Sequence, residues 1–249
     1  MKNITVSCML VFAWALSLTG CSSNEPEYSQ KITQCIKETR EVVRQRGGIL
    51  YFENPLRICL DKSLQQQVLP VMSFVDSEGS QIALQNLERP LVIQILSNEY
   101  SHSIYEREHL NAMVAQYSDK IDFIFLTNRE REISRMCSSK LYRAKFEKEC
   151  TPFQYAKQAK LVYFNKDEVD TADDDLGYII NGLRATEFPT TYYINKDRTI
   201  FKLEVLEDIM VRSNIIYRNS PGKSDEEIAR LSFEERVPEI LAALVKHNN

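Results

Sequence analysis

The stretch from residue 89 to residue 106 constrains the fold of this chain more than any other. Residues 91–96 form a nearly continuous apolar run of strand length, and such runs suit a strand that is buried on both faces of a sheet. After a polar turn, apolar residues recur at the spacing of one buried helix face: Leu110, Met113, Val114 and Tyr117. Because free N–H groups at a helix start hold anions and lower the pKa of a thiol, we expect this turn to carry the chemistry.

Further elements extend this pattern on both sides. Residues 121–126 form a second buried strand, so that strand, helix and strand make a right-handed βαβ unit. Upstream, residues 72–75 and 81–84 flank a turn that contains Gly79, as expected for a β-hairpin. Downstream, residues 161–164 predict another short strand. The pattern therefore favours an α/β fold.

A later segment has the sequence Phe188-Pro189-Thr190-Thr191 and is followed by a strand and a tight turn. Together with the hairpin and the βαβ unit, it resembles the thioredoxin-like fold, in particular its membrane-anchored TlpA-like branch. The resemblance covers roughly residues 71–205 and the closing helix. It implies a thioredoxin-like central sheet flanked by helices, with an N-terminal extension and a helical insertion. It also implies a cis peptide bond before Pro189, which faces the active-site turn in that family.

The family's two active-site cysteines have no counterpart here. In active members the strand ends in an aromatic residue and Cys-x-x-Cys, and a Glu often follows three residues after the second Cys. Setting Glu106 on that Glu places Ser103 and Tyr100 at the two cysteine positions. A disulfide reductase needs an attacking thiolate and a resolving thiol, so we expect a redox-inactive domain rather than an enzyme. The degenerate active-site turn comprises Glu99, Tyr100, Ser101, His102 and Ser103.

The same turn offers a second set of chemical groups. His102, Glu106 and His109 are spaced at i, i+4 and i+7, so a helix would stack them on one face. Imidazole and carboxylate groups can bind zinc or copper. The competing interpretation is a solvated helix face, and we predict no metal and no cofactor.

The N-terminus has the pattern of a targeting segment. Lys2 precedes an apolar region at residues 4–18, which is short for a membrane span. The sequence Leu18-Thr19-Gly20-Cys21 then resembles the lipobox of bacterial lipoproteins, in which the chain is cut before the cysteine and lipid is attached to it. This implies attachment to the membrane through Cys21, and Ser22 favours the outer membrane. A plain secretory signal is the alternative.

Cys8 lies in the predicted signal peptide and Cys21 is the predicted lipid site, so four thiols remain. An even number of thiols outside the cytoplasm suggests disulfides. Three pairings are open, and the cysteines nearest in sequence give Cys35–Cys59 and Cys137–Cys150. None of these cysteines has Cys-x-x-Cys spacing, so none predicts a redox centre or a zinc site.

The chain divides into four predicted segments: a signal peptide at 1–20, the lipidated cysteine and tether at 21–29, an N-terminal extension at 30–67, and the thioredoxin-like domain at 68–249 with an insertion at about 128–160. The extension predicts a helix at 30–46 and short strands at 49–52 and 56–60. In the domain, residues 201–205 predict a half-exposed edge strand. A closing helix spans 233–247, where Pro238 predicts a late start of the regular helix.

A net charge of −4 argues against nucleic acid as a partner, because nucleic-acid-binding surfaces are basic. We predict a lipid-anchored protein of the bacterial cell envelope with a binding or scaffold role. A protein or peptide partner would pair with the rim formed by Tyr100 and Pro189, by strand addition. The alternative is an enzyme or a metal-handling protein of the same family, using Cys137 and Cys150 for redox chemistry.

Overall fold

The structure is a computed structural model, and it describes residues 27–46, 55–97, 101–128, 139–140, 154–164, 178–180, 182–185 and 188–249. The predicted signal peptide, the Cys21 tether up to residue 26, the strand at 49–52 and most of the insertion at about 128–160 lie outside these residues. Within them, no helix is long and apolar enough to cross a membrane.

A five-stranded sheet with the order β5-β4-β3-β8-β9 forms the centre of the molecule. The strands β3 (Leu91–Leu96), β4 (Asp122–Asn128) and β5 (Lys160–Phe164) are parallel. The strands β8 (Thr190–Ile194) and β9 (Ile200–Val205) run antiparallel to their neighbours. Every residue of β3 is buried, as its apolar sequence predicts for a central strand. This strand order confirms the α/β, thioredoxin-like fold.

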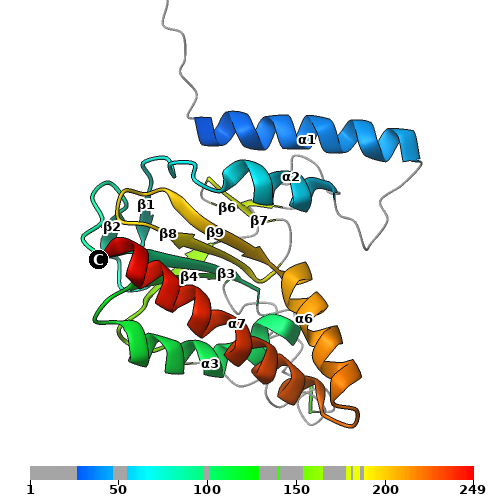
Figure 1. The fold of residues 1–249 in the computed structure, drawn as a ribbon. Helices are drawn as coiled ribbons and strands as arrows, with labels where there is room; N and C mark the ends of the chain where they lie inside the picture. Colours follow the sequence, from blue (N-terminus) through cyan, green and yellow to red (C-terminus); the bar gives the residue numbers. More distant parts are fainter. Residues whose placement is uncertain are drawn as a thin grey trace, which may run out of the picture.

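Helices cover both faces of the sheet (Figure 1). The helices α3 (Ser101–Tyr117) and α7 (Asp225–Asn248) pack on one face, and α1 (Glu27–Arg46) and α2 (Pro55–Leu64) pack on the other. The predicted inward face of α3 is confirmed for its central residues, since Leu110, Met113 and Val114 are buried. Tyr117 is only partly buried.

The N-terminal helices belong to the same core as the sheet rather than to a separate cap. The α1 helix begins at Glu27, three residues before the predicted start at residue 30. Its side chains Tyr28 and Ile32 are buried in one cluster with residues of the sheet. The hydroxyl groups of Tyr28 and Tyr192 of β8 lie 3.2 Å apart and share a hydrogen bond. The domain boundaries themselves stay a prediction.

The prediction of a strand at residues 56–60 is wrong, because these residues lie in α2. Leu56, Leu60 and Leu64 follow one another at the i, i+4 spacing of a helix, and all three are buried. Pro55 occupies the first helical position, where the missing N–H has no intrahelical partner to lose. A short apolar run alone does not separate strand from helix, and here packing on the sheet selects the helix.

The closing helix starts earlier than Pro238 predicts. The α7 helix begins at Asp225, and the backbone N–H of Glu227 donates to the side chain of its N-cap residue, Ser224, at 3.2 Å. Ile228 and Phe233 are buried before the proline is reached. Burial of this first half outweighs the hydrogen bond that Pro238 removes from the helix.

The predicted hairpin is confirmed, and it comprises β1 (Ser73–Val75) and β2 (Gln81–Ala83). Gly79 has a φ of 86°, which a residue without a side chain adopts at no steric cost. The carboxylate of Asp76 accepts hydrogen bonds from the backbone N–H groups of Glu78 and Ser80, and these, together with Lys160, hold the pKa of Asp76 below its usual value.

Three further elements have no counterpart in the sequence predictions: β6 (Tyr178–Ile180), β7 (Leu183–Ala185) and α6 (Leu206–Asn219). The β9 strand lies at the edge of the sheet as predicted, but it is not half exposed. Leu203, Glu204 and Val205 are buried in succession, because helices cover both faces of this strand.

Candidate functional site

The predicted active-site turn lies where β3 ends and α3 begins. Ser97, the first residue after β3, is buried, and the helix starts at Ser101. Glu99 and Tyr100 lie outside the described residues. The backbone of Ser101, His102 and Ser103 forms the first turn of α3, and the positions of their side chains are outside the description. Strand, turn and helix start thus follow the predicted order.

Pro189 lies beside this turn. The peptide bond between Phe188 and Pro189 is cis, as the resemblance implies. Thr190 pairs with Ile95 of β3, so the proline is adjacent in register to the last residue of that strand. Both Phe188 and Pro189 are buried. The fold therefore brings the proline to the turn, but the proline ring itself is covered.

A buried ion-pair network begins one helical turn further along α3. The side chain of Glu106 is 2% exposed, and its Oε1 atom lies 3.1 Å from Nη2 of Arg236 on α7. Its second oxygen accepts a hydrogen bond from Nε2 of Gln94 on β3, at 3.1 Å. The residue aligned with the family's glutamate is thus directed into the core rather than toward a substrate.

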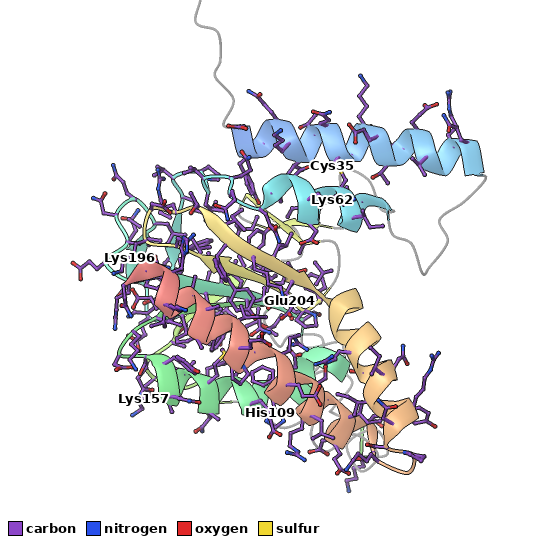
Figure 2. The ribbon with its side chains drawn as sticks, viewed as in Figure 1. Cys35, Lys62, His109, Lys157, Lys196 and Glu204 are labelled. Atoms are coloured by element: carbon purple, nitrogen blue, oxygen red, sulfur yellow. A yellow bond between two sulfur atoms is a disulfide. The ribbon has the colours of Figure 1, made fainter. Side chains whose placement is uncertain are left out.

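A second carboxylate contacts the same guanidinium. Oε1 of Glu204 on β9 lies 2.7 Å from Nε of Arg236, and Tyr193 of β8 donates its hydroxyl to the other oxygen at 3.2 Å. Lys202 approaches Glu204 at 4.0 Å. Figure 2 labels Glu204 near the end of β9, beside α7. Three sheet strands and two helices therefore meet in one polar cluster.

Two carboxylates share one buried guanidinium in this cluster, and the second cation, Lys202, is partly exposed and lies 4.0 Å from Glu204. Burial raises the pKa of Glu106, Arg236 counteracts this, and Glu204 raises the pKa further. The two carboxylates raise the pKa of Arg236 despite its burial. Burial and Glu204 raise the pKa of Tyr193 well above its usual value. Both carboxylate side chains are only 2% exposed, so a substrate would not reach either of them.

Of the three metal candidates, only Glu106 and His109 have described side chains, and these two contact different neighbours. Glu106 is occupied by Arg236 and Gln94, and the side chain of His102 is outside the description. The ring of His109 packs at 5.6 Å from the ring of Phe233 on α7. Among the described residues, no group of three His, Cys, Asp or Glu side chains could hold a metal ion.

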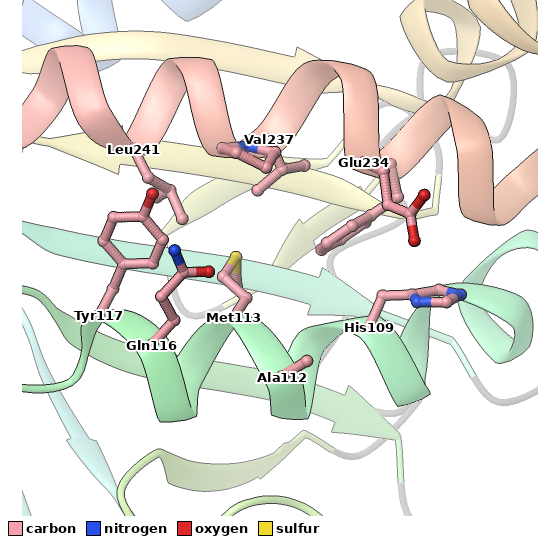
Figure 3. Close-up of a pocket in the computed structure, with 10 residues that line it drawn as sticks. His109, Ala112, Met113, Gln116, Tyr117, Glu234, Val237 and Leu241 are labelled. Carbon is pink, nitrogen blue, oxygen red and sulfur yellow. The ribbon is translucent and has the colours of Figure 1, made fainter.

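His109 instead lines a groove between α3 and α7 (Figure 3). The cavity has a volume of about 140 Å³. Its floor is apolar, with Met113 and Val237 pointing toward one another, and its two ends carry polar groups from Glu234 and Gln116. This is smaller than most ligand pockets, which span about 300–1,000 Å³.

The disulfide candidates separate into two groups. Cys35 and Cys59 form a disulfide that joins α1 to α2, on the opposite face of the sheet from α3 (Figure 2). This bond therefore lies away from the active-site turn. Cys137 and Cys150, together with the proposed lipid site Cys21, lie outside the described residues.

Sequence reasoning identified Glu106 but missed its partners, Arg236 and Glu204. The one available signal was Gln94, a polar residue inside an otherwise apolar strand. Such a side chain must find a partner when it is buried. Nothing in the sequence indicated that the partners would come from β9 and α7, more than 90 residues away.

No family model and no curated protein matches this chain. Several solved structures are similar in fold. A putative thiol:disulfide interchange protein DsbE from Chlorobium tepidum has a TM-score of 0.42 and 10% identity, over 73% of this chain and 97% of that one. The exposed lipoprotein thioredoxin Etrx1 from Streptococcus pneumoniae has a TM-score of 0.35 and 10% identity, over 67% and 99%. StoA from Bacillus subtilis has a TM-score of 0.33 and 11% identity, over 55% and 87%.

These TM-scores and identities are too low to assign the fold. We therefore assign it from the chain's own strand order, the position of the α3 start and the cis bond before Pro189. These features define a thioredoxin-like domain. Within it, the helix after the central strand carries a buried glutamate paired with an arginine.

Proposed function

We propose that this chain is a lipid-anchored protein of the bacterial cell envelope, in which a thioredoxin-like domain without a dithiol has a binding or scaffold role. The membrane attachment rests on the Leu-Thr-Gly-Cys sequence that ends at Cys21. The loss of redox chemistry rests on the turn between β3 and α3. No cysteine occurs anywhere in residues 60–136, which include this turn.

The observation that carries the proposal is the environment of Glu106. A glutamate near a reactive dithiol would have to exchange protons with solvent or substrate. Here its two oxygens contact Arg236 and Gln94, and its side chain is 2% exposed. The position has the contacts of a structural residue that fixes α3 against α7. Such a role suits a domain that binds rather than reacts.

We place the partner at the rim of the turn, around Tyr100 and Pro189. Because Pro189 is buried, the partner would contact the residues around the proline. An extended peptide that adds to exposed backbone there is the recognition mode that this fold favours.

The competing function is a thiol–disulfide oxidoreductase that uses Cys137 and Cys150. The fold supports it equally well, because thioredoxin-like domains include many such enzymes. The two functions differ in the state of these thiols, since an enzyme needs a low-pKa thiolate that reacts readily. A structural pair would stay oxidised and inert.

A reductase assay on the protein isolated from membranes tests the proposal. We expect no turnover of a disulfide substrate above the buffer control, and no reactive thiol until the protein is denatured and reduced. The variant Tyr100→Cys with Ser103→Cys should form a disulfide readily, since Cys-x-x-Cys at a helix start brings the two Cα atoms within about 7 Å. Turnover by the natural chain that disappears in Cys137→Ser would instead establish the oxidoreductase.

The same preparation tests the anchor. We expect the intact mass to show a chain that begins at Cys21 and carries lipid. A Cys21→Ala chain that stays equally membrane-bound would contradict the lipid attachment without bearing on redox activity.

A further inference from the structure

The outer face of the β1–β2 hairpin is exposed and carries no charge. Val71 and Val75 are 61% and 62% exposed, more than any other large apolar side chain among the described residues. The side chains of this face alternate with inward-facing ones such as Phe74, and the register pairs them across the two strands. The face consists of Val71, Ser73, Val75, Gln81 and Ala83.

The inner side of the hairpin is fixed to the domain, so its outer face has a defined orientation. Phe74 is buried in the same core cluster as Tyr28 and Leu64. In the turn, the backbone N–H of Ser77 donates to the carbonyl of Leu161 on β5, at 2.7 Å. The hairpin therefore belongs to the layer formed by α1 and α2, and its outer face points away from the sheet.

The chain also enters the domain through this layer. After α2, Gln66 donates its backbone N–H to the carbonyl of Ile200, at the start of β9. The first turn of α1 lies at this same end of the sheet (Figure 1). The hydrogen bond between Tyr28 and Tyr192 fixes that first turn to the sheet. The candidate site lies at the other end, where β3 and β9 finish.

Five residues separate Cys21 from Glu27. At about 3.6 Å per residue, this segment spans about 20 Å at most. A lipid on Cys21 would thus hold the hairpin end of the domain beside the bilayer. A tether this short gives the hairpin face an effective concentration at the bilayer in about the millimolar range or above. A weak affinity of this face for lipid is therefore sufficient to hold it there.

We infer that the outer face of the β1–β2 hairpin rests on the lipid surface, so that the candidate site points away from the membrane. The occupant of this face is the bilayer interface, which accepts an uncharged and partly apolar face without the desolvation of any charged side chain on it. The inference rests on the proposed lipid anchor. It explains why two valines, Val71 and Val75, are exposed on the outer face of the hairpin.

Tryptophan fluorescence tests this orientation, because the single tryptophan of the sequence, Trp14, lies in the predicted signal peptide. The variant Val75→Trp reports on the hairpin face. The variant Tyr217→Trp is the matched control, since Tyr217 is 56% exposed on α6, which follows the far end of β9. Each acylated variant is incorporated into phosphatidylcholine vesicles with plain or brominated acyl chains.

We expect brominated chains to lower the emission of Val75→Trp about twofold, as for a side chain at the acyl boundary, and to leave Tyr217→Trp unchanged. Adding Val71→Asp to Val75→Trp should restore the emission. The decisive case is protein with verified acylation that sediments with the vesicles. If Val75→Trp is then not quenched, or if both variants are quenched equally, the orientation is wrong, although the lipid anchor stands.

Protein that lacks lipid and stays in the supernatant would overturn the anchor and the orientation together. A soluble chain made without residues 1–21, in which Val75→Trp shows a concentration-dependent blue shift, would identify a second copy of the chain as the occupant and would also overturn the inference.

Discussion

The two faces of the central sheet are held by different chemistry, although they share the same strands. Tyr192 and Tyr193 are neighbours on β8 and point to opposite faces. Tyr192 shares a neutral hydrogen bond with Tyr28 of α1 and donates to the carbonyl of Arg184 at 2.5 Å. Tyr193 donates to the carboxylate of Glu204 in the ion-pair network under α7.

The α1/α2 face adds a covalent bond to this neutral packing, since Cys35 and Cys59 are joined there. The α3/α7 face instead places two carboxylates around one guanidinium. The comparison teaches that the α1/α2 face is held by neutral hydrogen bonds and a disulfide, whereas the α3/α7 face is held by buried charges. The helix that follows the proposed lipid site, α1, is thereby held to the sheet independently of α3, the helix that begins at the candidate site.

The largest effect should come from Arg236→Met, which removes the cationic partner of the buried Glu106 and leaves Glu204 with only the 4.0 Å contact to Lys202. Removing one partner of a buried ion pair costs about 3–5 kcal/mol, and Arg236 is only 11% exposed in its side chain. Urea unfolding at pH 7 measures the loss. The control is Arg230→Met, whose pair with Glu234 is half exposed and contributes less than about 1 kcal/mol. Equal losses in both variants would contradict a structural role for the network.

The next largest loss of stability should come from removing the disulfide with the double change Cys35→Ser and Cys59→Ser. The two cysteines are separated by 24 positions, and closing a loop of this size stabilises by about 2–4 kcal/mol. The loss should be the same at pH 5 and at pH 8, because no titrating group is removed. The matched control compares the natural chain and the variant when both are in reductant, where they should unfold at the same urea concentration.

A smaller effect, confined to a pH window, should come from Glu106→Gln. The pKa of Glu106 is raised above its ordinary value of 4.5, so the folded state binds this proton more tightly than the unfolded chain. The stability contributed by that proton is fully present below pH 4.5 and is lost as the pH rises through the folded pKa. The Glu106→Gln variant does not lose stability in this way, because glutamine does not titrate.

The unfolding free energy of Glu106→Gln should therefore increase relative to that of the natural chain as the pH rises, by at most about 1.4 kcal/mol per pH unit. Urea unfolding of both proteins from pH 4 upward measures it. The exposed acid Glu234 provides the control, and Glu234→Gln should show no such shift. Parallel pH profiles for Glu106→Gln and the natural chain would mean that folding leaves the pKa of Glu106 unchanged.

The smallest effect should come from Tyr28→Phe, which removes one buried hydroxyl from the α1 face. Such a hydrogen bond contributes about 1 kcal/mol, and Tyr192 keeps its bond to the carbonyl of Arg184. Tyr217→Phe on exposed α6 should have no measurable effect. A larger loss for Tyr28→Phe at high pH than at neutral pH would contradict the neutral character of this face.

The sequence by itself determined the central part of the fold. Continuous apolar runs predicted β3 and β4. The helical spacing of Leu110, Met113 and Val114, which are buried in the structure, predicted the helix between them. The turn residues around Gly79 gave the hairpin. These elements are specified locally, because periodicity and turn chemistry act over a few residues. The absence of cysteines from the predicted site was also a property of the sequence alone.

Only the tertiary structure decided what surrounds that site. Residues 56–60 have too short an apolar run to distinguish a strand from a helix, and packing on the sheet made them helical. Glu204 alternates like an exposed residue, yet it is buried because Arg236 reaches it from α7. A buried charge depends on a partner that the chain brings from far away. The sequence could therefore place Glu106 on the helix after the turn, but only the fold could pair it.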